Sequence, residues 1–167
     1  MDLSFSPGCS VNDNISKDIY LGEKIEGTYP NIDDLVGILT NKGRGSFMFK
    51  KDLKRAYRQF PICPGDLHLV DFNWNGYLFA DRVLPMGLRS SAQICQRITT
   101  SITFMYFKLG YMMVNYLDDF GRAETKEKGW KAYETLGELL MFCSLEESVD
   151  KAVTPTTKMT FLGVSFD

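Results

Sequence analysis

The sequence predicts an α+β fold in which helices pack on one face of an antiparallel sheet. A β-hairpin is indicated at Asn75-Gly76, which separates two runs of alternating apolar residues. Two later segments repeat apolar residues at helical spacing. The resulting order of strand, hairpin, helix, hairpin, helix and strand is typical of helices layered on an antiparallel sheet. Since 167 residues of which 44% are hydrophobic can bury one ordinary core, we expect a single domain.

The first part of the chain is predicted to contain a loop-rich segment, a helix and a strand. Residues 1–30 hold several Pro and Gly residues and indicate an extended segment with little regular structure. Asn31 can cap a short helix that ends before Gly43, with positions 32, 35, 36 and 39 on its apolar face. Residues 46–52 then predict a strand that ends on Asp52, and residues 53–59 a helical turn before Pro61.

The middle of the chain is predicted to form the hairpin and a long helix. The hairpin covers residues 67–84, with His68 in its first strand. The helix begins near Ser90, where Gln93 gives capping-box spacing, and it ends at Gly110. Its predicted apolar face, which we expect to be core, comprises Ile94, Ile98, Ile102, Met105 and Leu109.

The last part of the chain is predicted to contain a second hairpin, a helix and a strand. The hairpin turns at Asp118-Asp119, and the helix covers about residues 126–142. A loop containing Lys151 and Pro155 leads to a final strand at residues 159–164. The inward positions of the helix are predicted to be Trp130, Tyr133, Leu136 and Leu140.

Composition excludes several classes of function. A single histidine gives poor support to a nucleophile–histidine hydrolase. The four cysteines form no Cys-x-x-Cys pair, so neither a zinc site nor a disulfide framework is indicated. No apolar run reaches the roughly 18 residues that span a bilayer, and the first residues do not resemble a secretory signal. We therefore expect an intracellular protein, in the cytoplasm or nucleus, without a membrane partner and with reduced core thiols at Cys9, Cys63, Cys95 and Cys143.

Basic residues are concentrated in one segment although the net charge is −2. Residues 42–58 contain seven Lys and Arg residues and one acid, Asp52. Such a segment can bind phosphates even when the whole domain is acidic. For any one of these side chains, a solvated charged face is the alternative.

Asp118 and Asp119 interrupt an apolar run. Neighbouring side chains of a strand point to opposite faces, so a buried strand would leave one of these charges without a partner, and a tight turn relieves this cost. An ordinary acidic turn is the alternative, and we expect Asp33-Asp34 to be one. Asp52, at the end of an earlier strand, can join the pair if the two strands are neighbours.

Three clustered carboxylates repel, and the pKa of each would be raised unless a cation offsets their charge. Ligands that are all oxygen favour Mg²⁺ or Mn²⁺. Two such ions about 4 Å apart can activate a hydroxyl and stabilise the leaving oxygen of a phosphoryl transfer. The sequence therefore predicts a metal site at Asp52, Asp118 and Asp119 whose chemistry requires no histidine.

Four segments of the chain resemble four consecutive motifs of retroelement reverse transcriptases, in the order of that family. They are residues 49–57 (FKKDLKRAY), 84–92 (LPMGLRSSA), 116–119 (YLDD) and 161–163 (FLG). The resemblance covers nearly the whole chain. The segments 2–13 and 87–90 are similar to tyrosine-recombinase (DIRS-like) retrotransposons more than to retroviruses.

This resemblance implies a polymerase palm-type sheet with a partial fingers subdomain. The fingers would comprise residues 1–45 and about 60–85, and the palm residues 46–59 and 86–167, with a thumb and a ribonuclease H domain expected to be absent. The implied activity is that of an RNA-directed DNA polymerase that uses two Mg²⁺ or Mn²⁺ ions. The implied partners are an RNA or DNA template-primer, deoxynucleoside triphosphates and, if the chain is a fragment, the remaining polyprotein domains.

The resemblance also implies roles for single residues. Asp52, Asp118 and Asp119 would be catalytic metal ligands, with the backbone carbonyl of Leu53 nearby. Tyr57 would be a gate whose ring crowds a ribose 2′-OH, and a core aromatic is the alternative.

The remaining implied roles concern the nucleotide. Met86 and Gly87 would form the floor of its pocket, although the family usually has Gln or Phe in place of Met86. Arg89 would meet phosphate, with a surface salt bridge as the alternative. Lys151 would lie near the leaving pyrophosphate. Gln93 stands where a proline is common in the family.

The alternative function is that of a truncated, inactive or co-opted retroelement fragment that binds RNA or a protein. The three acids count against it, because a fold without catalysis gains nothing from carboxylates that repel one another. An RNA-recognition sheet module is disfavoured, because its glycine-aromatic signature is missing.

Overall fold

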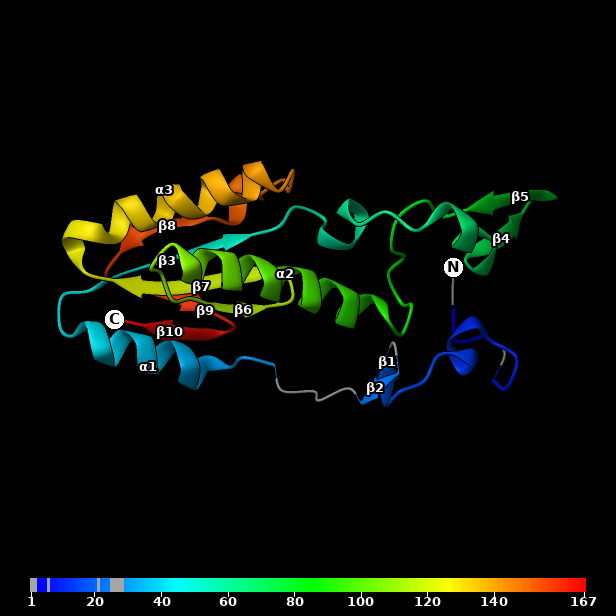
Figure 1. Cartoon of the computed structure of the whole chain (residues 1–167), viewed down its shortest axis with the longest axis horizontal. Helices are drawn as coiled ribbons and strands as arrows, with labels where there is room; N and C mark the ends of the chain where they lie inside the picture. The colour runs from blue at the N-terminus through cyan, green and yellow to red at the C-terminus, as the bar shows by residue number, and fades with distance from the viewer. Residues whose placement is uncertain (1–2, 6, 21, 25–28) are drawn as a thin grey trace. The chain divides into compact units, whose positions relative to one another are not determined.

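The computed structural model describes residues 3–5, 7–20, 22–24 and 29–167, which divide into two compact units (Figure 1). The sheet unit comprises Tyr29–Lys54 and Gln96–Asp167. The hairpin unit comprises the described residues before Tyr29 together with Arg55–Cys95. The predicted division into fingers and palm stays a prediction, and the two units have bounds of their own.

The sheet unit is built on four antiparallel strands, which confirms the predicted α+β class. Their order is β6 (Val114–Tyr116), β7 (Asp119–Glu124), β3 (Phe47–Asp52) and β8 (Val153–Thr156). β8 was expected to be a loop because it contains Pro155. A proline is tolerated there because β8 lies at the edge of the sheet, where one side needs no ladder hydrogen bonds.

Helix α1 (Ile32–Lys42) begins as predicted. The side chain of Asn31 accepts hydrogen bonds from the N–H groups of Asp33 and Asp34, and Gly43 ends the helix with a φ of 83°. The buried residues are Leu35 and Ile38. Val36, which was expected on the apolar face, is 41% exposed, so that part of the prediction is wrong.

Helices α2 (Ser91–Lys108) and α3 (Lys126–Phe142) are where the sequence predicts them, but their buried faces differ from the prediction. The buried positions of α2 are Ser91, Cys95, Thr99, Ile102 and Tyr106. In α3, Leu136 and Leu140 are buried as expected, whereas Trp130 is 50% exposed and Gly129 and Ala132 take the inward positions. Small residues and residues with hydroxyl groups thus occupy buried positions that differ from those predicted by the spacing of large apolar residues.

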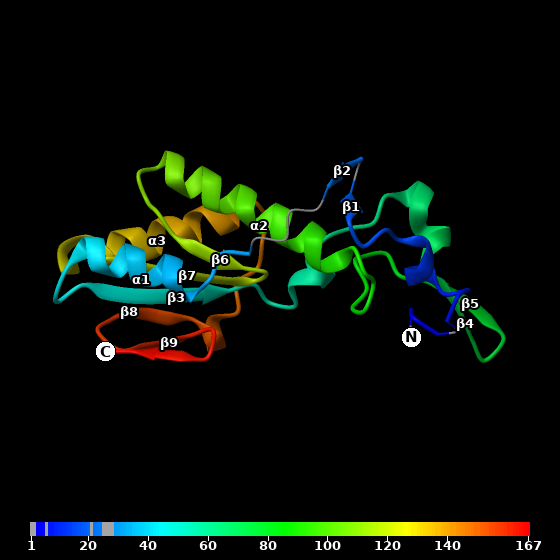
Figure 2. The same cartoon turned by 90° about the horizontal axis from the view of Figure 1, so that it is seen from below.

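Helices cover both faces of the sheet rather than the one face predicted, because β3 carries buried apolar residues on both sides. On β3, Phe49 contacts Tyr133 of α3, whereas Met48 points to the opposite face and packs in a core with Leu35 of α1. Figure 1 accordingly shows the strands between α3 and α1. The hairpin of β9 (Met159–Phe161) and β10 (Val164–Phe166) lies against β3 (Figure 2).

The last predicted strand is in fact this β9–β10 hairpin. The turn falls at Leu162-Gly163, whose φ values are 46° and 80°. Such left-handed backbone ends a strand. Phe161 nevertheless lies in the core, as its place in an apolar run suggests.

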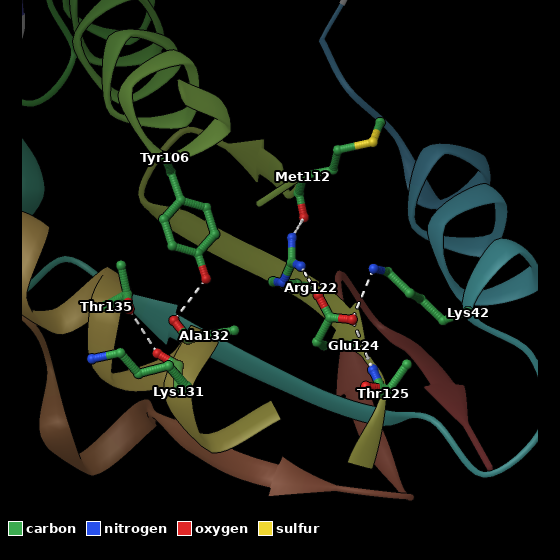
Figure 3. A network of polar contacts seen from close by, with 9 residues as sticks. All are labelled: Lys42, Tyr106, Met112, Arg122, Glu124, Thr125, Lys131, Ala132 and Thr135. Carbon is green, nitrogen blue, oxygen red and sulfur yellow. Dashed lines mark hydrogen bonds and ion pairs between the residues drawn. The ribbon is translucent and has the colours of Figure 1, made fainter. Parts of the chain in front are cut away.

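A buried polar network joins β7 to its surroundings in the sheet unit (Figure 3). Arg122, 1% exposed, donates to the carbonyl of Met112 and forms an ion pair with Glu124. Glu124 also pairs with Lys42 of α1 at 2.8 Å. The hydroxyl of Tyr106 donates to the carbonyl of Ala132 at 2.6 Å, which links α2 to α3. Buried charges of this kind are retained only when they are paired.

Apart from the first residues of α2, the described residues of the hairpin unit form short elements. Its two hairpins are β1 (Ile19–Tyr20) with β2 (Glu23–Lys24) and β4 (Asp71–Trp74) with β5 (Tyr77–Ala80). The second turns at Asn75-Gly76 and confirms the prediction. Three 3-10 helices complete the unit: η1 (Val11–Asn14), η2 (Ala56–Gln59) and η3 (Pro64–Leu69).

The structure differs from the predictions for His68 and for two of the cysteines. His68 lies in η3 rather than in a strand, because Pro64 starts a 3-10 helix there. Cys9 and Cys63 are exposed rather than core thiols, whereas Cys95 is buried. Within the described residues, no helix combines the length and the apolar character needed to cross a bilayer.

Candidate active site

Asp52 and Asp119 face each other on the two central strands of the sheet unit. Asp52 ends β3, Asp119 begins β7, and the two are register partners. Asp118 lies in the preceding turn, and its backbone carbonyl accepts a hydrogen bond from the N–H of Leu53 at 3.0 Å. The structure therefore brings the three predicted carboxylates and Leu53 together at one end of the sheet.

Burial and mutual repulsion raise the pKa values of the carboxyl groups of Asp118 and Asp119. For Asp119, burial is the main cause, followed by the charges of Asp52 and Asp118, and the pKa rises to about 6. A hydrogen bond with Asp52 adds to this rise. Burial and the charge of Asp52 likewise raise the pKa of Asp118. Burial and the neighbouring charges therefore disfavour the ionised forms of these two carboxyl groups.

Lys151 contacts the carboxylate of Asp52 directly. Its Nζ lies 3.3 Å from Oδ1 and 3.2 Å from Oδ2 of Asp52, and this hydrogen bond raises the pKa of the lysine. Lys151 ends the 3-10 helix η4 (Val149–Lys151), and Ser148 before it donates its N–H to the carbonyl of Asp52 at 2.7 Å. The loop that carries Lys151 is thus attached to the same strand end as Asp52.

A second lysine, Lys51, fixes the position of the loop that carries Lys151. Lys51, 3% exposed, pairs with Glu147 at 2.6 Å, and its ammonium lies 3.8 Å from the centre of the Tyr133 ring. Further along the chain, the N–H of Lys54 donates to the carbonyl of Glu146 at 2.9 Å. The buried ion pair and the backbone bonds fix the approach of the loop to β3.

The three carboxylates fit Mg²⁺ or Mn²⁺ by their chemistry. All their donor atoms are oxygen, and a bound cation would offset the burial and repulsion that raise the pKa values of Asp118 and Asp119. As the side chains lie, no group of three or more His, Cys, Asp or Glu residues in the described part of the chain is arranged to hold an ion. Lys151 instead contacts the Asp52 oxygens.

The predicted nucleotide loop lies in the hairpin unit and is held by Asn12. Asn12 is 5% exposed, donates to the carbonyl of Gly87 at 2.8 Å and accepts from the N–H of Arg89 at 2.7 Å. Gly87 has a φ of 88°, which favours glycine. The guanidinium of Arg89 donates to the carbonyl of Ile15 at 2.7 Å, and Met86 is 74% exposed.

Solved structures of foamy viral protease-reverse transcriptases have a fold similar to that of this chain. A foamy viral protease-reverse transcriptase in complex with an RNA/DNA hybrid is 25% identical with a TM-score of 0.67, over 84% of this chain and 18% of that one. Another, in complex with double-stranded DNA, is 22% identical with a TM-score of 0.74, over 93% and 25% of the two chains. A prototype foamy virus protease-reverse transcriptase mutant is 21% identical with a TM-score of 0.70, over 94% and 20%.

The chain has a reverse-transcriptase-like fold. No family model matches the sequence, and neither does any curated protein. The chain spans between about a fifth and a quarter of the length of these three solved chains.

In this reverse-transcriptase-like fold, most of the predicted basic segment is neutralised. Four of its residues form ion pairs with acids elsewhere: Lys42 with Glu124, Lys51 with Glu147, Lys54 with Glu146, and Arg58 with Asp81. Arg44, Lys50 and Arg55 take no part in the ion pairs found among the described residues. The charge available to phosphates is therefore smaller than the sequence suggests.

Tyr57 lies in η2 of the hairpin unit and is half-buried. Its predicted role as a gate, like the roles of Met86, Gly87 and Arg89, stays a prediction. The three acids and Lys151 belong to the sheet unit.

Sequence reasoning missed the polar residues that support the site. Asn12, Gln96, Asn115 and Lys51 are each bound to backbone or side chains near a motif. The available signal was a polar residue inside an otherwise apolar strand, as with Asn115 between Val114 and Tyr116. Such a residue must find hydrogen-bond partners if it is buried.

Proposed function

We propose that the chain is the polymerase domain of a retrotransposon reverse transcriptase. It transfers deoxynucleotides to a primer 3′-OH and releases pyrophosphate. The observation that carries this proposal is the meeting of Asp52, Asp118 and Asp119 at one sheet end in a reverse-transcriptase-like fold. The solved relatives in complex with an RNA/DNA hybrid or double-stranded DNA support a nucleic-acid substrate.

The three carboxylates would hold two Mg²⁺ or Mn²⁺ ions. When bound, such ions supply activation of the primer hydroxyl and stabilisation of the leaving oxygen. The acids of the chain supply the negative charge that attracts the ions. Because the pKa of Asp119 is about 6, its carboxyl is mostly ionised at neutral pH and can act as a ligand there.

The other predicted residues would bind the nucleotide. Tyr57 would crowd a ribose 2′-OH and so favour deoxynucleotides. Met86 and Gly87 would contact the incoming base. One guanidinium nitrogen of Arg89 donates to the carbonyl of Ile15, and the other N–H groups of this guanidinium would bind phosphate. Lys151 would leave Asp52 and contact the leaving pyrophosphate, where a cation stabilises developing negative charge.

Primer extension on an RNA template tests this function. The wild-type chain, with Mg²⁺ or Mn²⁺ and a deoxynucleoside triphosphate, should extend a DNA primer. Asp118→Asn and Asp52→Asn should abolish extension without unfolding the chain, because each removes a ligand and keeps the size of the side chain. Asp33→Asn, which changes the charge of another acidic pair, is the matched control and should extend normally. Extension by Asp118→Asn at the wild-type rate, or none by the wild-type chain, would contradict the proposal.

The alternative is a fragment that binds RNA or a protein without catalysis. Neutralisation of most of the basic segment favours it over a chain that grips a duplex on its own. The effect of Mn²⁺ on thermal stability distinguishes the two functions. A polymerase site should gain thermal stability as Mn²⁺ is added, since an ion that binds only the folded state stabilises it by mass action. An inactive fragment should show no gain that depends on Asp118.

A further inference from the structure

A cluster of polar side chains supports the turn at Leu117-Asp118, which precedes Asp119. We call it the Asn115 cluster, and it comprises Gln96, Thr99, Thr103 and Asn115, all in the sheet unit. Asn115 is 1% exposed and Thr99 is fully buried. A buried amide without partners is costly, so the bonds within the cluster constrain both elements that carry it.

Both polar atoms of the Asn115 side chain are bonded to α2. Nδ2 donates to Oγ1 of Thr99 at 3.0 Å, and Oδ1 accepts from the hydroxyl of Thr103 at 2.9 Å. In β6, Asn115 is the register partner of Phe120 in β7. The residue therefore joins the helix to the two strands that meet at the acidic turn.

Gln96 holds the turn itself. Its Oε1 accepts from the backbone N–H of Leu117 at 2.7 Å, and its Nε2 donates to Oγ1 of Thr100 at 3.2 Å. Leu117 has a φ of 50°, a left-handed conformation that costs a non-glycine residue about 1 kcal/mol. Such backbone persists only where its surroundings fix it.

The carbonyl of the next residue, Asp118, accepts from the N–H of Leu53 of the neighbouring chain segment. The turn is therefore held on one side by α2 and on the other by the end of β3. With both sides fixed, the backbone of Asp118 has little freedom to reorient its carboxylate.

We propose that Gln96 and Asn115 are positioning residues for the carboxylates of Asp118 and Asp119. The inference rests on the proposed function, because it concerns ligands of the same metal site. Each of the two residues fixes the backbone that presents the acids. Hydrogen bonds are directional, so this cluster fixes an orientation that apolar contacts of the same size would leave less defined.

The test measures Mn²⁺ affinity of the full chain by titration calorimetry, beside the thermal midpoint Tm. Gln96→Met removes the acceptor for Leu117, and Thr103→Val removes a donor to Asn115. Each should weaken Mn²⁺ binding by about tenfold, which is the usual effect of losing a residue that orients metal ligands. Gln96→Glu keeps an acceptor oxygen and should restore affinity. Ser101→Ala, which removes an exposed hydroxyl from the same helix, is the matched control and should bind as the wild type does.

Amide hydrogen exchange adds a reading that needs no metal. The Leu117 amide should exchange faster in Gln96→Met than in the wild type, because it loses its acceptor. If Thr103→Val fails to fold, Gln96→Met decides the matter, since Gln96 is only partly buried.

The outcomes separate this inference from the proposed function. Unchanged Mn²⁺ affinity in Gln96→Met and Thr103→Val, with a lower Tm, would overturn the inference alone, because the cluster would then be purely structural. Wild-type protein that binds no Mn²⁺ through Asp118 would overturn the proposed function, and the inference with it.

Discussion

The ammonium of Lys151 lies 3.2 Å from Oδ2 of Asp52, at the position where the proposed function requires a metal ion. The contact is easily exchanged, because the lysine side chain is 63% exposed and an exposed ion pair contributes at most about 1 kcal/mol. A divalent cation at the proposed metal site would therefore compete with Lys151 for the Asp52 carboxylate.

Replacing Lys151 should make the carboxylates more available to metal. Lys151→Met is expected to raise Mn²⁺ affinity about threefold, the effect of losing an exposed competing charge, while it slows primer extension. Titration calorimetry and single-turnover extension measure the two effects. Lys158→Met, which breaks another exposed ion pair, with Asp167, should change neither. Weaker Mn²⁺ binding by Lys151→Met would contradict this competition.

The carboxyl of Asp119 should make stability depend on pH in the absence of metal. Its pKa is raised to about 6, so between about pH 4 and pH 6 the folded chain binds more protons than the unfolded chain. The free energy of unfolding therefore falls as pH rises through this window. Asp119→Asn should remove this term and stabilise the metal-free chain by about 1 kcal/mol at pH 7.5. Urea denaturation at pH 4.5 and pH 7.5 measures it, and a variant less stable than wild type at pH 7.5 would be inconsistent with the raised pKa.

Gly121 should not tolerate a side chain. A Cβ at this position would lie 2.7 Å from Cζ of Phe161, a core residue that is 1% exposed. Gly121→Ala should therefore destabilise the chain by about 1–3 kcal/mol, the usual cost of overpacking. The double variant with Phe161→Leu should recover part of that loss, because the shorter side chain leaves room. A thermal melt of both variants gives the answer, and equal stability of Gly121→Ala and wild type would refute the packing argument.

Glu147 should matter more for stability than its partial exposure suggests. Glu147→Gln would leave the buried charge of Lys51 without its partner, which should cost about 3 kcal/mol. Adding Lys51→Met to that variant should restore much of the stability, because neither charge then remains. Chemical denaturation of the two variants measures the difference. If the double variant is less stable than Glu147→Gln alone, the lysine is held by other contacts.

The elements that the sequence predicts well are those whose signal is local. Asn31 with its capping acids and Asn75-Gly76 each specify backbone geometry through neighbouring residues. The predicted acidic turn is present but falls at Leu117-Asp118, one residue before the predicted Asp118-Asp119, and Asp119 begins β7. The meeting of Asp52 with Asp119 was also predictable, because short connections often make strands neighbours.

The elements that the sequence misses depend on tertiary partners. Thr99 is buried on α2 because Asn115 bonds to it, and an apolar count has no means to detect that contact. Pro155 indicates a loop, and only its place on an edge strand makes it compatible with the sheet. Likewise Lys42, Lys51 and Arg58 look like a phosphate-binding surface until their acidic partners are located.

The proposed metal site is tested by Mn²⁺ titration of the wild-type chain beside Asp52→Asn, Asp118→Asn and Asp33→Asn. We expect the wild type and Asp33→Asn to bind Mn²⁺ alike, and each of the other two variants to lose affinity by at least about tenfold, since each lacks one ionised ligand. If Asp118→Asn binds Mn²⁺ as tightly as the wild type does, the Asp118 carboxylate is not a ligand of the metal site.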